Sequence, residues 1–331
     1  MIRVKASRRS VCPSGPDQTT RKTAFVFLRI VFRAFRAFAA FRLDMSLETV
    51  SQPQRASARS LLRSPGAVAA LAVAVLTLAG WAALLAEAFR AGGGADAFLG
   101  AICRPVALER GSSAWSLASA FAASAALWIV MSVAMMLPTA APMALAYADV
   151  AERRAAQGLR SPSPLLLIGG YLGVWAVISV AAAALQSAAG AFWPLLGVPE
   201  RAAGVLAGFA IGGAGLYQFS DMKLRCLAFC RTPVSAFEAG LTERPSSALR
   251  LGVQQGVQCL GCCGATMALM LVAGTMNLLW MGVFALLNTV EKVTAGGLAP
   301  RIIGAGLILA GLGVAVSAVG FDLVWRAMVA R

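Results

Sequence analysis

The sequence predicts an all-α protein, a polytopic transmembrane helical bundle, and three observations support this class. Of the 331 residues, 59% are hydrophobic and only 13% are charged, whereas an average soluble domain has roughly 45–50% apolar and about 25% charged residues. Long apolar runs recur along the chain, without the alternating polarity that a transmembrane barrel would need. The 33 glycines are typical of membrane helices that pack closely.

About seven apolar runs approach the roughly 20 residues with which a helix crosses about 30 Å of hydrocarbon. They lie near 66–86, 114–137, 164–190, 202–219, 252–273, 275–290 and 300–324. We expect a tight hairpin between the fifth and sixth, because Gly274 and Asn277 interrupt the helical pattern. Pro138 and Pro142 are expected to break or kink the helix at the end of the second. The transmembrane domain is therefore expected to cover 66–331.

Residues 1–65 form a separate basic segment. The first 44 residues hold ten Lys or Arg and two acids, a net of +8 out of the total of +15. Phenylalanines between Arg29, Arg33 and Arg36 also fit an amphipathic helix on an anionic membrane surface. Met45 begins an ordinary polar lead into the first span, so we expect a disordered leader or a misassigned start before it. The positive charge thus indicates a lipid bilayer as partner, and no nucleic acid.

The placement of Lys and Arg predicts the orientation. Counted from Met45 with the start inside, thirteen basic residues fall in cytoplasmic segments and six fall on the opposite side. We therefore expect a multi-pass protein of the bacterial inner (plasma) membrane with a cytoplasmic N-terminus.

Glycines recur at helical spacing in two of the runs. Gly204, Gly208 and Gly212 form a stripe in the fourth run, and the seventh has a similar set at Gly304, Gly306, Gly311 and Gly313. Such stripes let two helices approach closely, so these glycines are expected to be structural.

The stretch "GVQQGVQCLGCCGATM", at 252–267, places three cysteines within five positions. On a helix they fall within about 100° of one another, and methionines continue the same face. A second pair of cysteines, Cys226 and Cys230, follows the fourth run on its basic side. Two methionines, Met135 and Met136, lie at the end of the second run, and Glu291 lies at the end of the sixth. The candidate metal ligands are Cys259, Cys262, Cys263, Met267, Met270, Cys226, Cys230, Met135, Met136 and Glu291.

The ligand types indicate a soft metal. Sulfur ligands favour Cu(I) above all and then zinc or an iron–sulfur cluster, and the chain has no histidine. Zinc is the weaker candidate, because a structural zinc site usually takes four ligands from two separated pairs and "CxxCC" supplies three. Buried Cys and Met also serve as ordinary core residues, so packing stays open as an alternative, above all for Met135 and Met136.

Four stretches carry a resemblance to a known family. They are "AMMLPTAAPM" (134–143), "YQFSDMKLRCLAFCRTP" (217–233), "CLGCCGATM" (259–267) and "GTMNLLWM" followed by "EK" (274–281 and 291–292). In this order they resemble the predicted metal-binding integral membrane proteins, domain of unknown function 2182, and the resemblance implies metal binding. The chain departs from the family pattern, which commonly has histidine where Gln255 stands, tryptophan at Gly264 and proline at Asp221.

Three hypotheses for function follow. The first is a membrane protein that binds Cu(I) for handling, delivery or translocation, with a metal-donor or metal-acceptor protein as partner. The second is a membrane thiol–disulfide oxidoreductase, and the third is a scaffold or assembly partner without chemistry. Nothing indicates a hydrolase or kinase, since the sequence lacks a histidine for a triad, a phosphate-binding glycine loop and a nucleophile elbow. The oligomeric state is left open.

Overall fold

The computed structural model describes residues 64–90, 114–273, 278–294 and 296–320. All regular secondary structure within these ranges is helical, which confirms the all-α class there. The helices are α3 (Pro65–Arg90), α5 (Ala114–Ala156), α6 (Pro164–Leu196), α7 (Glu200–Tyr217), α8 (Asp221–Arg231), α9 (Val234–Gly240), α10 (Pro245–Ala273), α11 (Leu278–Val293) and α12 (Leu298–Val319). The predictions for the basic segment 1–63 lie outside the described residues.

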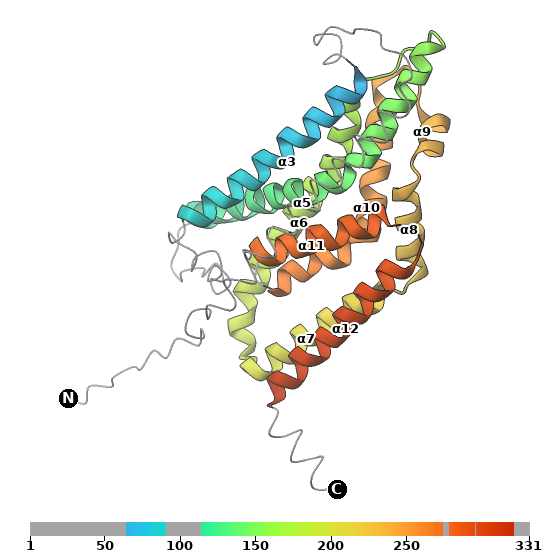
Figure 1. The fold of residues 1–331 in the computed structure, drawn as a ribbon. Helices are drawn as coiled ribbons and strands as arrows, with labels where there is room; N and C mark the ends of the chain where they lie inside the picture. The colour runs from blue at the N-terminus through green and yellow to red at the C-terminus, as the bar shows by residue number, and fades with distance from the viewer. Residues whose placement is uncertain (1–63, 91–113, 274–277, 295, 321–331) are drawn as a thin grey trace, which may run out of the picture.

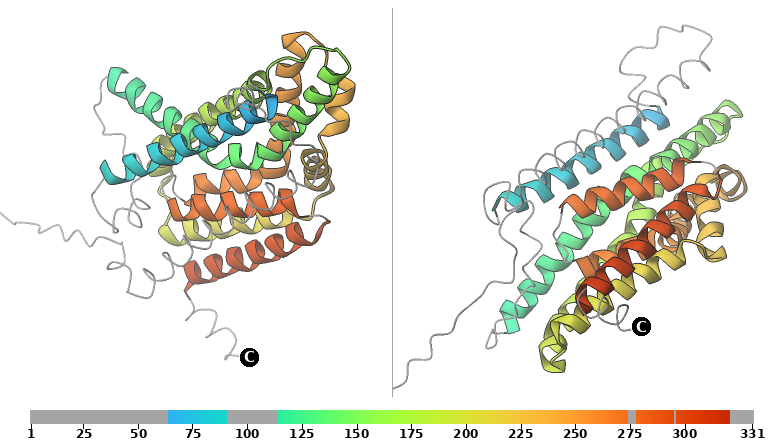
Figure 2. Two further views of the ribbon diagram at one scale, coloured as in Figure 1. Left: turned by 45° about the horizontal axis from the view of Figure 1, so that its top comes forward. Right: turned by 60° about the horizontal axis from the view of Figure 1, so that its bottom comes forward.

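Four long helices make the main body of the bundle. Helix α3 packs along α5, α5 along α6, and α6 along α10, and α11 lies against α5 and α10. The short helices α8 and α9 pack beside α10, while α7 and α12 form a closely packed pair on the side away from α3 (Figures 1 and 2). One continuous core of buried side chains contains the clustered cysteines of α10. Large apolar side chains such as Leu78, Phe209 and Leu309 are exposed on the outside, as a lipid-facing surface requires.

Within the part of the chain that the structure describes, four helical segments are long and apolar enough to cross a membrane. They are Pro65–Glu87, Leu117–Ala156, Pro164–Phe192 and Leu298–Val319, and the bent pair Arg201–Tyr217 and Asp221–Arg231 would make a fifth. The seven expected spans are therefore not confirmed, because the runs 252–273 and 275–290 are helical in their described parts but are not among these segments. Helix α11 has only 16 residues, about 24 Å at 1.5 Å per residue, and α10 carries Gln254, Gln255 and Gln258 in its first half.

The expected hairpin and the two prolines have different outcomes. Helices α10 and α11 pack against each other, but the turn between them, 274–277, lies outside the described residues. Helix α5 runs through Pro138 and Pro142 without a break. Of the expected break or kink, the break is therefore wrong. Figure 1 shows α5 bent along its length, as prolines inside a helix favour, because each lacks an N–H and clashes with the preceding turn.

The α7–α12 contact depends on glycine. A Cβ atom placed on Gly208 would lie 2.6 Å from Gly311 O, and one on Gly311 would lie 2.6 Å from Gly208 O. Glycine therefore permits the close approach of these two helices, as predicted. The prediction does not hold for Gly212, Gly306 and Gly313, where an added Cβ would meet nothing within 4 Å.

Candidate metal centre

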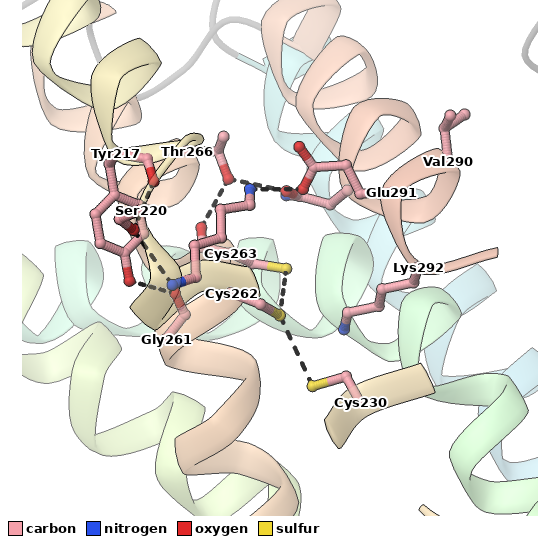
Figure 3. A network of polar contacts seen from close by, with 12 residues as sticks. Tyr217, Ser220, Cys230, Gly261, Cys262, Cys263, Thr266, Val290, Glu291 and Lys292 are labelled. Carbon is pink, nitrogen blue, oxygen red and sulfur yellow. Dashed lines mark hydrogen bonds and ion pairs between the residues drawn. The ribbon is translucent and has the colours of Figure 1, made fainter. Parts of the chain in front are cut away.

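Three thiols lie together on one face of α10. Cys259, Cys262 and Cys263 are each 1% exposed, and their Sγ atoms all lie within 4.8 Å of one another. The Sγ atoms of Cys262 and Cys263 are 3.3 Å apart, and Figure 3 shows both pointing to the same side of the helix. The spacing seen in the sequence thus produces one buried group of sulfurs, which we call the thiol cluster (Cys259, Cys262 and Cys263).

Helix α8 adds a fourth sulfur. The Sγ atom of Cys230 is 3.8 Å from the Sγ atom of Cys262 (Figure 3). Cys226, one turn earlier, is placed differently: its side chain covers Gly261 of α10, where the missing Cβ leaves room for the sulfur. Both cysteines of α8 are half-buried, and all five are free thiols. The structure therefore brings Cys230, rather than Cys226, directly to the thiol cluster.

The methionines predicted as ligands are buried in the same core as the thiol cluster. Met267 and Met270 follow the cysteines along α10, and Met135 and Met136 lie on α5. Burial of this kind fits apolar packing as well as ligation, so a ligand role for these four residues stays a prediction.

A lysine and a tyrosine contact the thiol of Cys259. The Nζ atom of Lys292, at the end of α11, donates to Cys259 Sγ at 3.1 Å and to Thr139 Oγ1 at 2.8 Å, and Figure 3 shows it reaching toward the cysteines. The hydroxyl of Tyr171 lies 3.1 Å from the same sulfur and donates to Met136 O. A cation beside a thiol favours the thiolate, which is the form that binds metal. The surroundings of Cys259 therefore suit a thiolate ligand.

Two polar contacts fix the backbone of α10 beside the thiols. Thr266 Oγ1 donates to Cys263 O at 2.7 Å and lies 2.9 Å from Asn288 Oδ1 of α11. On the other side, the hydroxyl of Tyr217 from α7 donates to Gly261 O at 2.6 Å (Figure 3). The positions of the sulfurs are thus set jointly by α7, α10 and α11.

Glu291, also predicted as a ligand, takes part in a buried ion pair. Its Oε2 atom is 2.7 Å from Lys223 Nζ, and both side chains are 1% exposed. Arg231, the residue after Cys230, donates from Nε to the backbone carbonyl of Glu291 at 3.0 Å. The ion pair therefore joins α8 to α11 next to the thiol cluster, and direct ligation by Glu291 stays a prediction.

Reasoning from the sequence placed Lys292 at the same end of the bundle as the cysteines but did not predict its contact with Cys259. It missed Tyr171 as a neighbour of the thiols and Lys223 as the partner of Glu291. A signal for the lysines was present. Beyond residue 22, Lys223 and Lys292 are the only lysines, and arginine supplies every other positive charge. Tyr171 is one of only three tyrosines in the chain, and an isolated phenol in an apolar run usually has a hydrogen-bond partner.

The distances among the sulfurs fit a bound metal ion. A tetrahedral ion with metal–sulfur bonds of about 2.3 Å separates its sulfurs by roughly 3.8 Å. The contact between Cys230 and Cys262 has this length. The Sγ atoms of Cys262 and Cys263 are closer, at 3.3 Å, and all three in the thiol cluster lie within 4.8 Å of one another, so a bound ion requires only small adjustments. The donor set is all sulfur, which is the set that soft metal ions prefer.

Comparison with known proteins places these features in a family. The model of the family PpoB2, described as copper chaperone, matches residues 125–314, more than half of the 331-residue chain. The matched range includes the thiol cluster, Cys230 and Lys292. No curated protein and no solved structure matches the chain.

Proposed function

The chain belongs to the PpoB2 copper chaperone family, and we propose from this premise that it binds Cu(I) and exchanges it with a metal-handling partner protein at a membrane. One observation carries the proposal: three buried thiols within 4.8 Å of one another, with the Cys230 thiol 3.8 Å from Cys262. Cu(I) is the cargo, and the four cysteines are its proposed ligands.

The surroundings favour Cu(I) over zinc. The sulfur-only donor set accepts both ions, but the thioethers buried nearby, Met267 and Met270, are ligands for Cu(I) rather than zinc. A single Cu(I) held by several thiolates leaves a net negative charge, and the Lys292 ammonium on Cys259 Sγ offsets part of it. Burial of an unpaired charge would otherwise be costly.

The membrane setting is part of the proposal. Four described helices, or five with the bent pair, are long and apolar enough to cross a bilayer. We propose that the protein is a multi-pass protein of the bacterial inner membrane with a cytoplasmic start, as the distribution of Lys and Arg indicates.

Metal binding by purified protein tests the proposal. The protein is kept in detergent without oxygen, and Cu(I) is titrated in competition with the chromophoric chelator bicinchoninate. We expect wild type to bind Cu(I) more tightly than about 1 µM, and the double variant Cys262→Ser/Cys263→Ser to lose this binding. Cys103→Ser, which removes one thiol far along the sequence from α8 and α10, is the matched control and should bind as wild type does. Failure of wild type to bind, or full retention by the double variant, would refute the proposal.

The contact between Cys230 and Cys262 also keeps the oxidoreductase hypothesis testable. Thiols 3.8 Å apart need only a small movement to form a disulfide, whose bond length is about 2.05 Å. Trapping free thiols in cells with a maleimide, followed by mass spectrometry, distinguishes the two functions. Copper binding predicts that both cysteines are reduced in growing cells, and a substantial disulfide fraction that changes with the redox state would favour the oxidoreductase.

A further inference from the structure

Helix α8 carries a row of three sulfur side chains that leads from the surface to the thiol cluster. Met222, Cys226 and Cys230 follow one another at intervals of four residues, which places them on one helical face. Met222 is 62% exposed, the two cysteines are half-buried, and Cys262, which Cys230 contacts, is 1% exposed. Soft ligands are thus spaced at about one helical turn from outside to inside.

The outer face of α8 suits water rather than hydrocarbon. Four of its eleven residues are charged, and two of these, Asp221 and Arg225, are exposed. Exposed charges of this kind are expensive within the hydrocarbon region. Helix α8 is also bent by 60° from α7, so it does not simply continue the apolar helix before it.

The thiol cluster lies level with the end of a helix. Lys292 is the residue before the last in α11, and its ammonium contacts Cys259 Sγ. The cluster itself lies at the middle of the 29-residue α10, so the ends of that helix do not connect it to water. The polar face of α8, which contacts the cluster through Cys230, therefore provides the short path between water and the buried sulfurs.

We propose that Met222 and Cys226 form a loading route by which Cu(I) from a thiol-bound carrier reaches Cys230 and the thiol cluster. This inference rests on the proposed function and adds two transient ligands that are not part of the final site. Met222, a neutral thioether, receives the ion weakly, and Cys226 passes it inward to Cys230.

Each step is a ligand exchange without oxidation or reduction. A bond from Cu(I) to a carrier sulfur breaks as a bond to Met222 or Cys226 forms, and copper stays in the +1 state. Cys226, Cys230 and the cluster thiols release protons as they bind, and the carrier thiolates take up protons from solvent as they are released. A row of soft ligands with graded exposure allows this because no step leaves the ion without sulfur.

The rate of loading tests the route separately from the affinity. Wild type, Met222→Leu and Cys226→Ser are mixed anaerobically with Cu(I)–glutathione, and loading is followed by stopped-flow ultraviolet absorbance of the copper–thiolate bonds. We expect each variant to load roughly tenfold more slowly, by analogy with the 10- to 100-fold effects of residues around metal sites. The final amount of bound copper and its affinity should equal those of wild type. Met222→Cys, which keeps a soft ligand, should load at the wild-type rate, and Cys103→Ser should do so as the control for loss of one thiol.

The possible results separate the route from the proposed function. Unchanged loading rates in both Met222→Leu and Cys226→Ser would overturn the route and leave the copper site standing. A lower copper stoichiometry in Cys226→Ser would also overturn it, because Cys226 would then belong to the final site. Failure of wild type to bind Cu(I) would refute the proposed function, and the route with it.

Discussion

At the scale of single residues, Lys292 is the side chain whose removal should change copper binding most directly without removing a sulfur. Its ammonium contacts Cys259 Sγ at 3.1 Å, and hydrogen bonds to charged groups contribute about 1.5–3 kcal/mol. We therefore expect Lys292→Met to weaken Cu(I) affinity by roughly 10- to 100-fold, measured by competition with bicinchoninate. Lys292→Arg keeps the charge and should lose less. Thr139→Val removes the other acceptor of Lys292 and serves as the control, and equal affinity in Lys292→Met and Thr139→Val would contradict the role of the charge.

The buried pair of Lys223 and Glu291 predicts a stability effect. Removal of one partner leaves an uncompensated buried charge, which costs about 3–5 kcal/mol, whereas replacement of both by apolar residues is often neutral. We expect Lys223→Met and Glu291→Gln each to lower the thermal unfolding midpoint of the protein in detergent. The double variant Lys223→Met/Glu291→Met should recover most of the loss. If both single variants were as stable as wild type, the ion pair, whose Nζ and Oε2 atoms lie 2.7 Å apart, would not stabilise the contact between α8 and α11.

At the scale of elements, the contact between α7 and α12 predicts that alanine substitution will affect stability differently at two glycines one helical turn apart, Gly208 and Gly212. A methyl group at Gly208 would lie 2.6 Å from Gly311 O, but one at Gly212 would meet nothing within 4 Å. Gly208→Ala should therefore separate the helices and destabilise the protein by about 1–3 kcal/mol. Gly212→Ala, with the same chemical change, should be neutral or slightly stabilising because alanine favours the helix. Thermal unfolding of both variants checks this, and equal midpoints would contradict the packing.

The sequence predicts features that depend on residues close together in the chain, and it predicts less well the contacts between residues far apart in the chain. Apolar runs place the long helices. The run expected near 164–190, for example, is α6, which begins at Pro164 after the capping residue Ser163. The common face of Cys259, Cys262 and Cys263 follows from helical periodicity alone. The contact of Cys230 with Cys262 joins residues 32 positions apart, and that of Lys292 with Cys259 joins residues 33 apart. Periodicity holds no information about such tertiary contacts. The expected topology brings these segments to the same end of the bundle, but it does not specify which side chains touch.

At the scale of the whole molecule, helix ends gather at two ends of the bundle. Figure 1 shows the start of α3, the end of α5 and helix α9 together at one end. Polar contacts link separate segments at this end. Arg153 Nη1 lies 3.3 Å from Glu238 Oε1, and the backbone N–H of Arg160 donates to Glu243 Oε1. This end holds several of the basic residues that predict a cytoplasmic location. The positive-inside rule therefore predicts that this end of the bundle faces the cytoplasm.

The difference between the seven expected spans and the four or five candidate spans among the described helices does not change that prediction. Helices α10 and α11 pack against each other, and the last turn of α11 meets the middle of α10, where Lys292 contacts Cys259. The segments before α7 precede both helices in the chain, so a test at the two ends of α6 does not depend on α10 or α11. The orientation can thus be tested without first deciding how deeply α10 and α11 insert.

Labelling from each side of the membrane tests the orientation directly. Gln157 lies in the exposed turn after α5, and the exposed Pro199 lies just before α7, at the other end of the bundle. In the Cys12→Ser/Cys103→Ser background, we expect Gln157→Cys to react with a membrane-impermeant maleimide only in inside-out vesicles. Pro199→Cys should react in intact spheroplasts, because the predicted orientation places its loop outside, and the parent without either new cysteine corrects for Cys226 and Cys230. The reverse pattern would place α8 and its sulfur row on the outer face, and the copper carrier would then have to be sought outside the cytoplasm.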